Sequence, residues 1–147
     1  MIMLTFEKII NADLTTVWQK LWGEDTYPKW TSAFSADSRM QSDWQVNGRT
    51  LFLDGSQNGM ISTISEMNEP NVLVFTHLGF MENGVEDFDS PQVLKMKGAQ
   101  EKYFLSENTQ GQTIVKVELD TDAEWEDMMR NGFTKGLDIL KALSESA

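Results

Sequence analysis

Residues 122–147 read DAEWEDMMRNGFTKGLDILKALSESA, and this stretch decides the fold. At 100° per residue its apolar side chains gather on one side of a helix, so we expect one long amphipathic helix. A glycine costs a helix interior about 1 kcal/mol relative to alanine. Gly132 and Gly136, on the midline of the apolar side, therefore predict a close approach, or a space, where the helix crosses its partner. The expected inward residues are Trp125, Met128, Met129, Gly132, Phe133, Gly136, Ile139, Leu140 and Leu143.

The partner predicted for this helix is a curved antiparallel sheet. Alternation over 2–10 predicts a first strand, and helical spacing over 14–22 predicts a helix that Asn11 or Asp13 caps and Gly23 ends. A second short helical turn is expected over 24–30, interrupted near Pro28. Turn dipeptides at 47–48, 58–59 and 110–111 then separate apolar or alternating runs. With the first strand, these runs make about seven strands: 34–40, 49–54, 59–66, 72–80, 100–107 and 112–120.

One long segment, residues 81–98, shows neither period and is polar and acidic. A loop of this length within a compact domain is usually a lid, a binding loop or disordered. We expect it to be irregular and to act as a gate.

The order of these elements predicts an α+β fold in which the last helix covers the concave face of the sheet. The chain resembles the helix-grip fold of the START/Bet v 1-like (SRPBCC) superfamily, and in particular its branch named after the activator of Hsp90 ATPase. The resemblance covers nearly the whole chain and implies a curved sheet of about six to seven strands wrapped around a long C-terminal helix, with two short helices after the first strand. It rests on these segments: Asn11-Ala12-Asp13 with Val17-Trp18, Trp30, Gly48, Glu69-Pro70 with Leu73-Val74-Phe75, Gly111-Gln112-Thr113, and Trp125, Phe133, Gly136 and Leu140.

Length and composition limit the function classes. The chain of 147 residues is expected to form a single domain, 1–147, and its net charge of −11 argues against nucleic-acid or anionic-membrane partners. It has no cysteine, no apolar run that could span a bilayer and no secretion signal, so we expect a cytoplasmic protein. The pattern says nothing about its oligomeric state.

Aromatic and methionine side chains are the main binding candidates. The chain has nine methionines and five tryptophans, and methionine suits apolar surfaces that accept guests of different shape. An ordinary packed core is the alternative. Because helix-grip proteins commonly hold an apolar pocket between helix and sheet, the resemblance implies a cavity for a hydrophobic or amphipathic small molecule. The expected lining is Trp30, Phe34, Met60, Phe75, His77, Tyr103, Trp125, Met128, Met129 and Phe133.

His77, the only histidine, is the one weak catalytic candidate. It shares a strand face with Leu73 and Phe75, and histidine suits proton transfer near neutral pH. A cyclase- or hydrolase-like enzyme is thus one alternative function, with Glu66, Glu101 or Asp120 as the orienting carboxylate. A chaperone partner of the Hsp90 type, implied by the family name, is another.

We expect no metal and no cofactor. With one histidine and no cysteine, a zinc site is very unfavourable. The stretch 54–59 imitates a calcium loop but lacks the glutamate at the twelfth position, and is better explained as a hairpin turn. We expect the acidic residues of 81–98 to be solvated and not to bind a metal ion.

Overall fold

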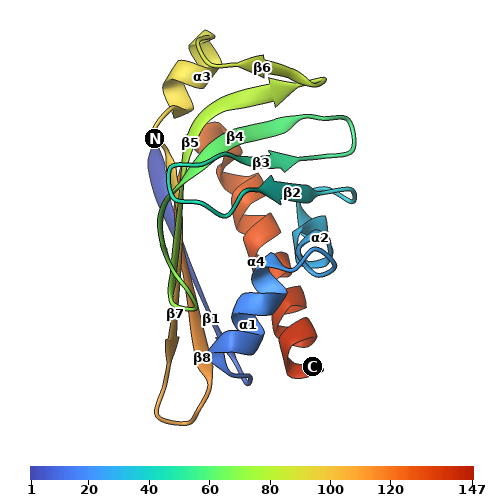
Figure 1. Cartoon of the computed structure of the whole chain (residues 1–147), viewed down its shortest axis with the longest axis vertical. Helices are drawn as coiled ribbons and strands as arrows, with labels where there is room; N and C mark the ends of the chain where they lie inside the picture. The colour runs from blue at the N-terminus through green and yellow to red at the C-terminus, as the bar shows by residue number, and fades with distance from the viewer.

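The computed structural model describes residues 1–147 and shows one eight-stranded sheet in which every strand pair is antiparallel. The strands lie in the order β1-β8-β7-β5-β4-β3-β2, and β6 pairs with β5 (Figure 1). The strands are β1 (Ile2–Ile10), β2 (Arg39–Ser42), β3 (Thr50–Leu53), β4 (Gly59–Asn68), β5 (Val72–Glu82), β6 (Val85–Asp87), β7 (Gln100–Glu107) and β8 (Thr113–Thr121). The helices are α1 (Leu14–Trp22), α2 (Tyr27–Trp30), α3 (Pro91–Met96) and α4 (Glu126–Glu145), with 3-10 turns η1 (Thr31–Ala33) and η2 (Ala123–Trp125).

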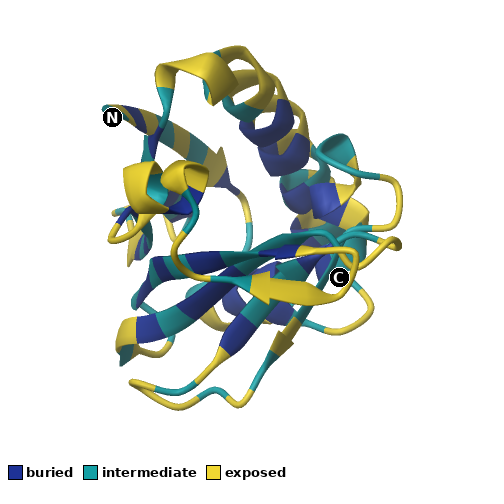
Figure 2. Ribbon diagram, turned by 90° about the horizontal axis from the view of Figure 1, so that it is seen from above, coloured by how far each residue is buried: buried dark blue, intermediate teal, exposed yellow.

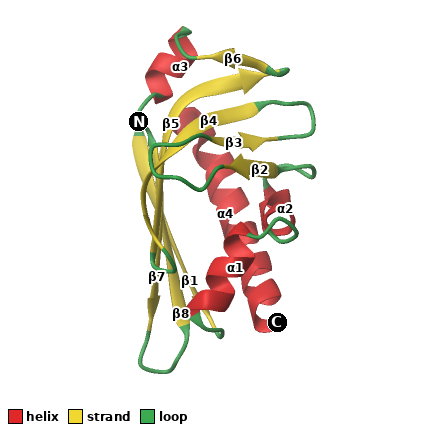
Figure 3. Ribbon diagram, in the orientation of Figure 1, coloured by secondary structure: helices red, strands yellow, loops and turns green.

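The sheet is strongly bent, and α1, α2 and α4 lie on its inner side, while α3 sits at one end beside β5 (Figure 3). Buried residues line the surfaces of α4 and of the strands that look toward each other (Figure 2). The predicted α+β helix-grip architecture is confirmed.

Strand alternation places one continuous apolar face under the helices. Leu73 and Phe75 on β5, and Val115, Val117 and Leu119 on β8, are all buried, as their spacing predicts. They belong to one core that also contains Phe133 and Leu140 of α4. The main core of the molecule is therefore the space between α4 and the sheet.

The two midline glycines of α4 make room for aromatic rings, not for a strand. A methyl group on Gly132 would overlap the ring of Phe34, and one on Gly136 would lie 2.9 Å from the carbonyl oxygen of Trp30. Contact with the sheet comes from Phe133, which stacks on Phe6 of β1 with ring centroids 5.1 Å apart. The prediction of a close approach is right, but its partner is the segment that leaves α2.

The first turns after β1 follow the sequence closely. Asp13 caps α1 by accepting from the Thr16 amide at 2.7 Å, and Gly23 ends the helix. Pro28 does not interrupt the second helix, because it occupies the first turn of α2, where no amide hydrogen bond is needed.

Two local predictions are wrong. Residues 34–38 are not strand, because the chain continues from α2 through η1 into a turn in which Asp37 accepts from the Ser35 hydroxyl; β2 begins only at Arg39. Residues 81–98 are not irregular either. A turn at Asn83-Gly84, both with positive φ, produces β6, and Ser90 caps α3. This explains the eighth strand.

None of the helices is both long and apolar enough to cross a membrane.

Candidate functional site

A cavity of about 250 Å³ lies between α4 and the inner face of the sheet. Its deepest walls are aromatic and aliphatic side chains that are almost fully buried, and its outer walls carry half-buried polar groups. The lining residues are Tyr27, Trp30, Thr31, Phe34, Ser35, Ser38, Phe52, Leu53, Asp54, Asn58, Gly59, Met60, His77, Met96, Glu101, Tyr103, Leu119, Asp120, Thr121, Met129 and Phe133.

The structure brings most of the expected lining residues together around this cavity. Six segments supply them: α2, the turn after η1, strands β4, β5 and β7, and α4 opposite. The expected residues that line the cavity are Trp30, Phe34, Met60, His77, Tyr103, Met129 and Phe133.

Three expected residues lie elsewhere. Phe75 is fully buried one layer behind the cavity, against Phe52 and Tyr103. Trp125 is 45% exposed and Met128 is 43% exposed, so neither faces the cavity.

Met128 is exposed because α4 is rotated about its axis relative to the predicted stripe, and Trp125 lies in η2, before α4 begins. Its buried residues are Gly132, Phe133, Gly136, Leu137, Leu140 and Ser144, because the helix is held by β1 on one side and by η1, α1 and α2 on the other. The predicted stripe assumed a single partner.

His77 is buried on β5, where its Nδ1 lies 2.6 Å from the Ser62 hydroxyl on β4. Burial lowers the pKa of His77 to about 4, against a smaller opposing effect of the Asp120 carboxylate. The imidazole is therefore neutral at pH 7. With Nδ1 engaged by Ser62, Nε2 is the ring nitrogen left for a guest in the cavity. A neutral histidine of this kind can position a polar group, but it is poorly suited to general acid–base catalysis near neutral pH.

Glu101 is the more distinctive ionisable group. It projects from β7 on the same face as Tyr103, between Phe75 of β5 and Leu119 of β8. Burial raises the pKa of Glu101 to about 7, although a hydrogen bond with the Tyr103 hydroxyl offsets part of the rise. At neutral pH the carboxyl exists in both protonation states and can either donate or accept a proton.

Two tyrosines share the environment of Glu101. Burial raises the pKa of the Tyr27 and Tyr103 phenols well above the ordinary value, and the nearby Glu101 charge raises both further. Both phenols therefore stay protonated and present hydroxyl groups beside a carboxyl. This trio can hydrogen-bond a hydroxyl or carbonyl group that enters an otherwise apolar cavity.

Sequence reasoning named Glu101 and Asp120 only as possible partners of His77, and both line the cavity. It missed Tyr27 and Leu119. The alternation Glu101-x-Tyr103-x-Leu105 carried a signal for Glu101, because it places a carboxyl on the face that buries Tyr103 and Leu105. Glu66 is exposed on β4 and does not line the cavity.

The acidic segments form turns. Asp54 accepts from the amides of Ser56 and Asn58 at 2.8 and 3.0 Å, which closes the β3–β4 hairpin. Glu86 pairs with Arg49, and Asp87 accepts from the amide of Ser90. No group of three or more histidine, cysteine, aspartate or glutamate side chains is arranged to hold a metal ion.

Solved structures with the same architecture resemble this chain over almost its whole length. Protein MLL2253 from Mesorhizobium loti aligns with a TM-score of 0.75 at 12% identity, covering 99% of this chain and 98% of that one. The Aha1 dimer from Colwellia psychrerythraea aligns with a TM-score of 0.66 at 17% identity over 99% and 96%. The AHSA1-like protein from Aeromonas hydrophila gives 0.67 at 19% identity over 99% and 93%.

The chain has the helix-grip fold. The structural neighbours include Aha1-like proteins, as the sequence resemblance indicates. No protein-family model and no curated protein matches the sequence itself. At these identities the likeness establishes the helix-grip fold alone, so the function has to be argued from the cavity.

Proposed function

We propose that this helix-grip protein binds a small apolar or amphipathic molecule in the cavity between α4 and the sheet. The observation that carries the proposal is an apolar cavity with a few polar groups in its wall, which is the usual composition of a small-molecule site. Its volume of about 250 Å³ lies just under the range typical for drug-sized ligands, so we expect a compact guest.

The lining also favours a particular chemistry. Flat walls formed by Trp30, Phe133 and Tyr103 suit a planar ring system. The carboxyl of Glu101 and Nε2 of His77 can hydrogen-bond one hydroxyl group on that ring system. An aromatic alcohol is thus a suitable first probe.

The test is a titration of ¹⁵N-labelled protein with 2-naphthol, followed through the indole N–H signals. Trp30 reports on the cavity, because its ring lines it while its Nε1 donates to the Leu21 carbonyl at 2.9 Å. We expect a saturable shift of Trp30 and no shift of the exposed Trp125. An unmoved Trp30 signal at millimolar 2-naphthol would refute the proposal.

Two neighbouring methionines provide a matched pair of variants. Met129 lines the cavity and Met128 does not. Met129→Trp should fill the space and weaken 2-naphthol binding at least tenfold, whereas Met128→Trp should leave it unchanged. Equal binding by both variants would place the guest elsewhere.

An enzymatic role is the second candidate, and the pKa of Glu101 favours it. A carboxyl with a pKa of about 7 matches the requirement for general acid–base catalysis at neutral pH, which neutral His77 does not. Hydrolysis of 2-naphthyl acetate by the wild type should be lost in Glu101→Gln and kept in His77→Gln. Turnover that survives Glu101→Gln would end this candidate.

A chaperone-linked role is favoured by the likeness to the Aha1 structures. The apolar side chains of Leu94, Trp125 and Met128 are exposed and would be available to a protein partner. Immobilised protein should then retain the Hsp90 homologue of its host, and less of it after Trp125→Ala. No retained complex would dismiss the role.

A further inference from the structure

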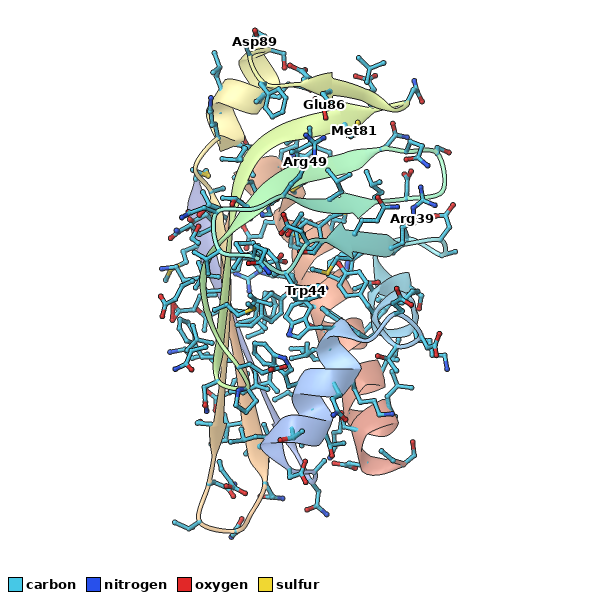
Figure 4. All side chains as sticks on the ribbon, viewed as in Figure 1. Arg39, Trp44, Arg49, Met81, Glu86 and Asp89 are labelled. Atoms are coloured by element: carbon cyan, nitrogen blue, oxygen red, sulfur yellow. The ribbon has the colours of Figure 1, made fainter.

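A second cavity of about 330 Å³ lies between the α1–α2 corner and β2 with the loop that follows it. It shares only Tyr27 with the first cavity. Figure 4 labels two of its residues, Arg39 on β2 and Trp44 in the loop beyond that strand, close to α1. Its lining includes Trp22, Glu24, Tyr27, Arg39, Ser42 and Trp44.

Two residues of this lining each carry a buried hydrogen-bond donor without a partner. The donors are Nε1 of Trp22, whose side chain is only 9% exposed, and Nε of Arg39. The one other unpaired buried side-chain atom in the protein is the hydroxyl of Ser144 on α4. Buried polar groups are normally hydrogen-bonded, and leaving one unpaired costs about 1–3 kcal/mol. Because an indole and a guanidinium N–H can only donate, the missing group must be an acceptor.

The charge of Arg39 points to an anionic acceptor. Its neighbour Asp37 has a lowered pKa, first through the Ser35 hydroxyl and only last through the charge of Arg39. Glu24 also lines the cavity but is exposed. Arg39 is thus partly buried and has no carboxylate within 4.0 Å, although the Asp37 carboxylate lies near enough to feel its charge. The ion pairs within 4.0 Å involve only Lys8, Arg49, Lys95, Lys116, Arg130 and Lys141 on the basic side.

The aromatic rings around the cavity favour an anion that is attached to a flat, unsaturated group. Trp22 stacks on Tyr27 and meets Trp44 edge-on, each pair with ring centroids 6.2 Å apart. Trp44 has a φ of 55°, a conformation that is rare and strained for a bulky residue. Its amide donates to the Ser42 hydroxyl at 3.0 Å, which helps to hold the indole in this position. Backbone strain that presents an aromatic ring to a cavity is typical of ligand sites.

We propose that this second cavity binds a small organic carboxylate with a flat, unsaturated body. The carboxylate oxygens accept hydrogen bonds from the Arg39 guanidinium and from Nε1 of Trp22, and the rings of Trp22, Tyr27 and Trp44 hold the body. This site is separate from the one in the proposed function and does not depend on it.

The probe is 2-naphthoate, and the readout is the indole N–H signal of Trp22, assigned with the Trp22→Phe variant. We expect a saturable downfield shift, because Nε1–H changes from unpaired to hydrogen-bonded to an anion. The neutral isostere 2-naphthamide should bind at least tenfold more weakly. Trp30 serves as the internal reference, since its indole lines the first cavity only.

Arg39→Gln should weaken 2-naphthoate binding at least tenfold and leave 2-naphthol binding in the first cavity unchanged. Arg130→Gln is the matched control, because Arg130 is exposed on α4 and paired with Glu126 at 2.8 Å. It should change neither affinity.

Three results would overturn the inference. They are an unmoved Trp22 signal at millimolar 2-naphthoate, which would mean that water alone satisfies the donors; equal binding of acid and amide; and unchanged binding by Arg39→Gln. Failure of the first cavity would show instead at Trp30 with 2-naphthol, so the two proposals fail separately. Should Arg39→Gln not fold, Arg39→Lys keeps the charge without the planar fork and should bind several-fold more weakly than the wild type.

Discussion

The two cavities on either side of Tyr27 respond to burial in opposite ways. In the first, burial acts on the carboxyl of Glu101, which relieves the cost by taking up a proton, as its pKa of about 7 shows. In the second, burial acts on Nε of Arg39, a nitrogen that can only donate and has no acceptor. An acid can adapt alone to an apolar place, whereas an arginine needs an acceptor. The buried polar groups of the first cavity therefore need no ligand, whereas those of the second lack an acceptor.

Removing the ring that lines the second cavity and also packs against a wall of the first should have the largest effect. Trp22 packs against Tyr27 and Trp44 beside the second cavity and against Tyr103, which lines the first, with centroids 4.8 Å apart. Trp22→Ala should lower the free energy of unfolding by about 3–5 kcal/mol in urea titrations. It should weaken binding of both naphthyl probes.

Trp125→Ala is the control for that variant, because it removes the same side chain from an exposed position. It should change the free energy of unfolding by less than about 0.5 kcal/mol. If the two variants were equally stable, the packing of Trp22 between the two cavities would not stabilise the fold.

Glu101→Gln tests whether the first cavity adapts by protonation. The folded pKa of about 7 lies above the ordinary 4.5, so the folded state holds a proton that the unfolded state releases. The stability due to Glu101 is complete below pH 4.5 and is lost as the pH rises through 7. The variant should match the wild type at pH 4 and exceed it by about 1–3 kcal/mol at pH 8 in urea unfolding. An equal difference at both pH values would contradict a raised pKa.

His77 provides an effect of opposite sign in the same cavity. Its folded pKa of about 4 lies below the ordinary 6.5, so the stability it contributes is present above pH 6.5 and is lost as the pH falls toward 4. Between pH 4.5 and 6.5 this loss opposes the gain from Glu101.

The Glu101→Gln variant should therefore show the effect of His77 alone. The free energy of unfolding of this variant should fall by about 1–2 kcal/mol from pH 6.5 to pH 4.5. The wild type should stay nearly level over this range. The double variant with His77→Gln, which keeps a hydrogen-bonding group beside Ser62, should also stay level. A wild type that loses stability as steeply as Glu101→Gln would show that the two groups do not offset one another.

The fold could be predicted from local patterns because strand alternation, turn dipeptides and helix caps each depend on only a few consecutive residues. Asp13 and Gly23 mark both ends of α1, and the strand faces of Leu73 and Val117 follow from a period of two. The strand predicted over 34–40 failed at 34–38. These residues suit a strand as well as a turn, and the tertiary packing of Phe34 against Gly132 decides between the two.

The first cavity could be predicted only in part. Met129 and Phe133 follow from the helical stripe, but the rotation that exposes Met128 depends on α4 having partners on two sides. The second cavity left no signal at all. Trp22 and Arg39 belong to an α-helix and a strand far apart in sequence, and their unpaired nitrogens exist only because the α1–α2 corner folds over β2.

Arg39→Met is the smallest and most pointed test of the comparison. Since the buried Nε of Arg39 has no partner and this costs free energy, replacing the side chain with an apolar one of similar length should raise the free energy of unfolding, by about 0.5–1 kcal/mol. Saturating 2-naphthoate should reverse the order, because only the wild type gains stability from the bound acid. Arg130→Met, which breaks the exposed pair with Glu126, should change the free energy of unfolding by no more than about 0.5 kcal/mol and should not respond to the acid. If Arg39→Met were less stable than the wild type without ligand, the guanidinium would already have an acceptor, and the second cavity would not need a bound anion.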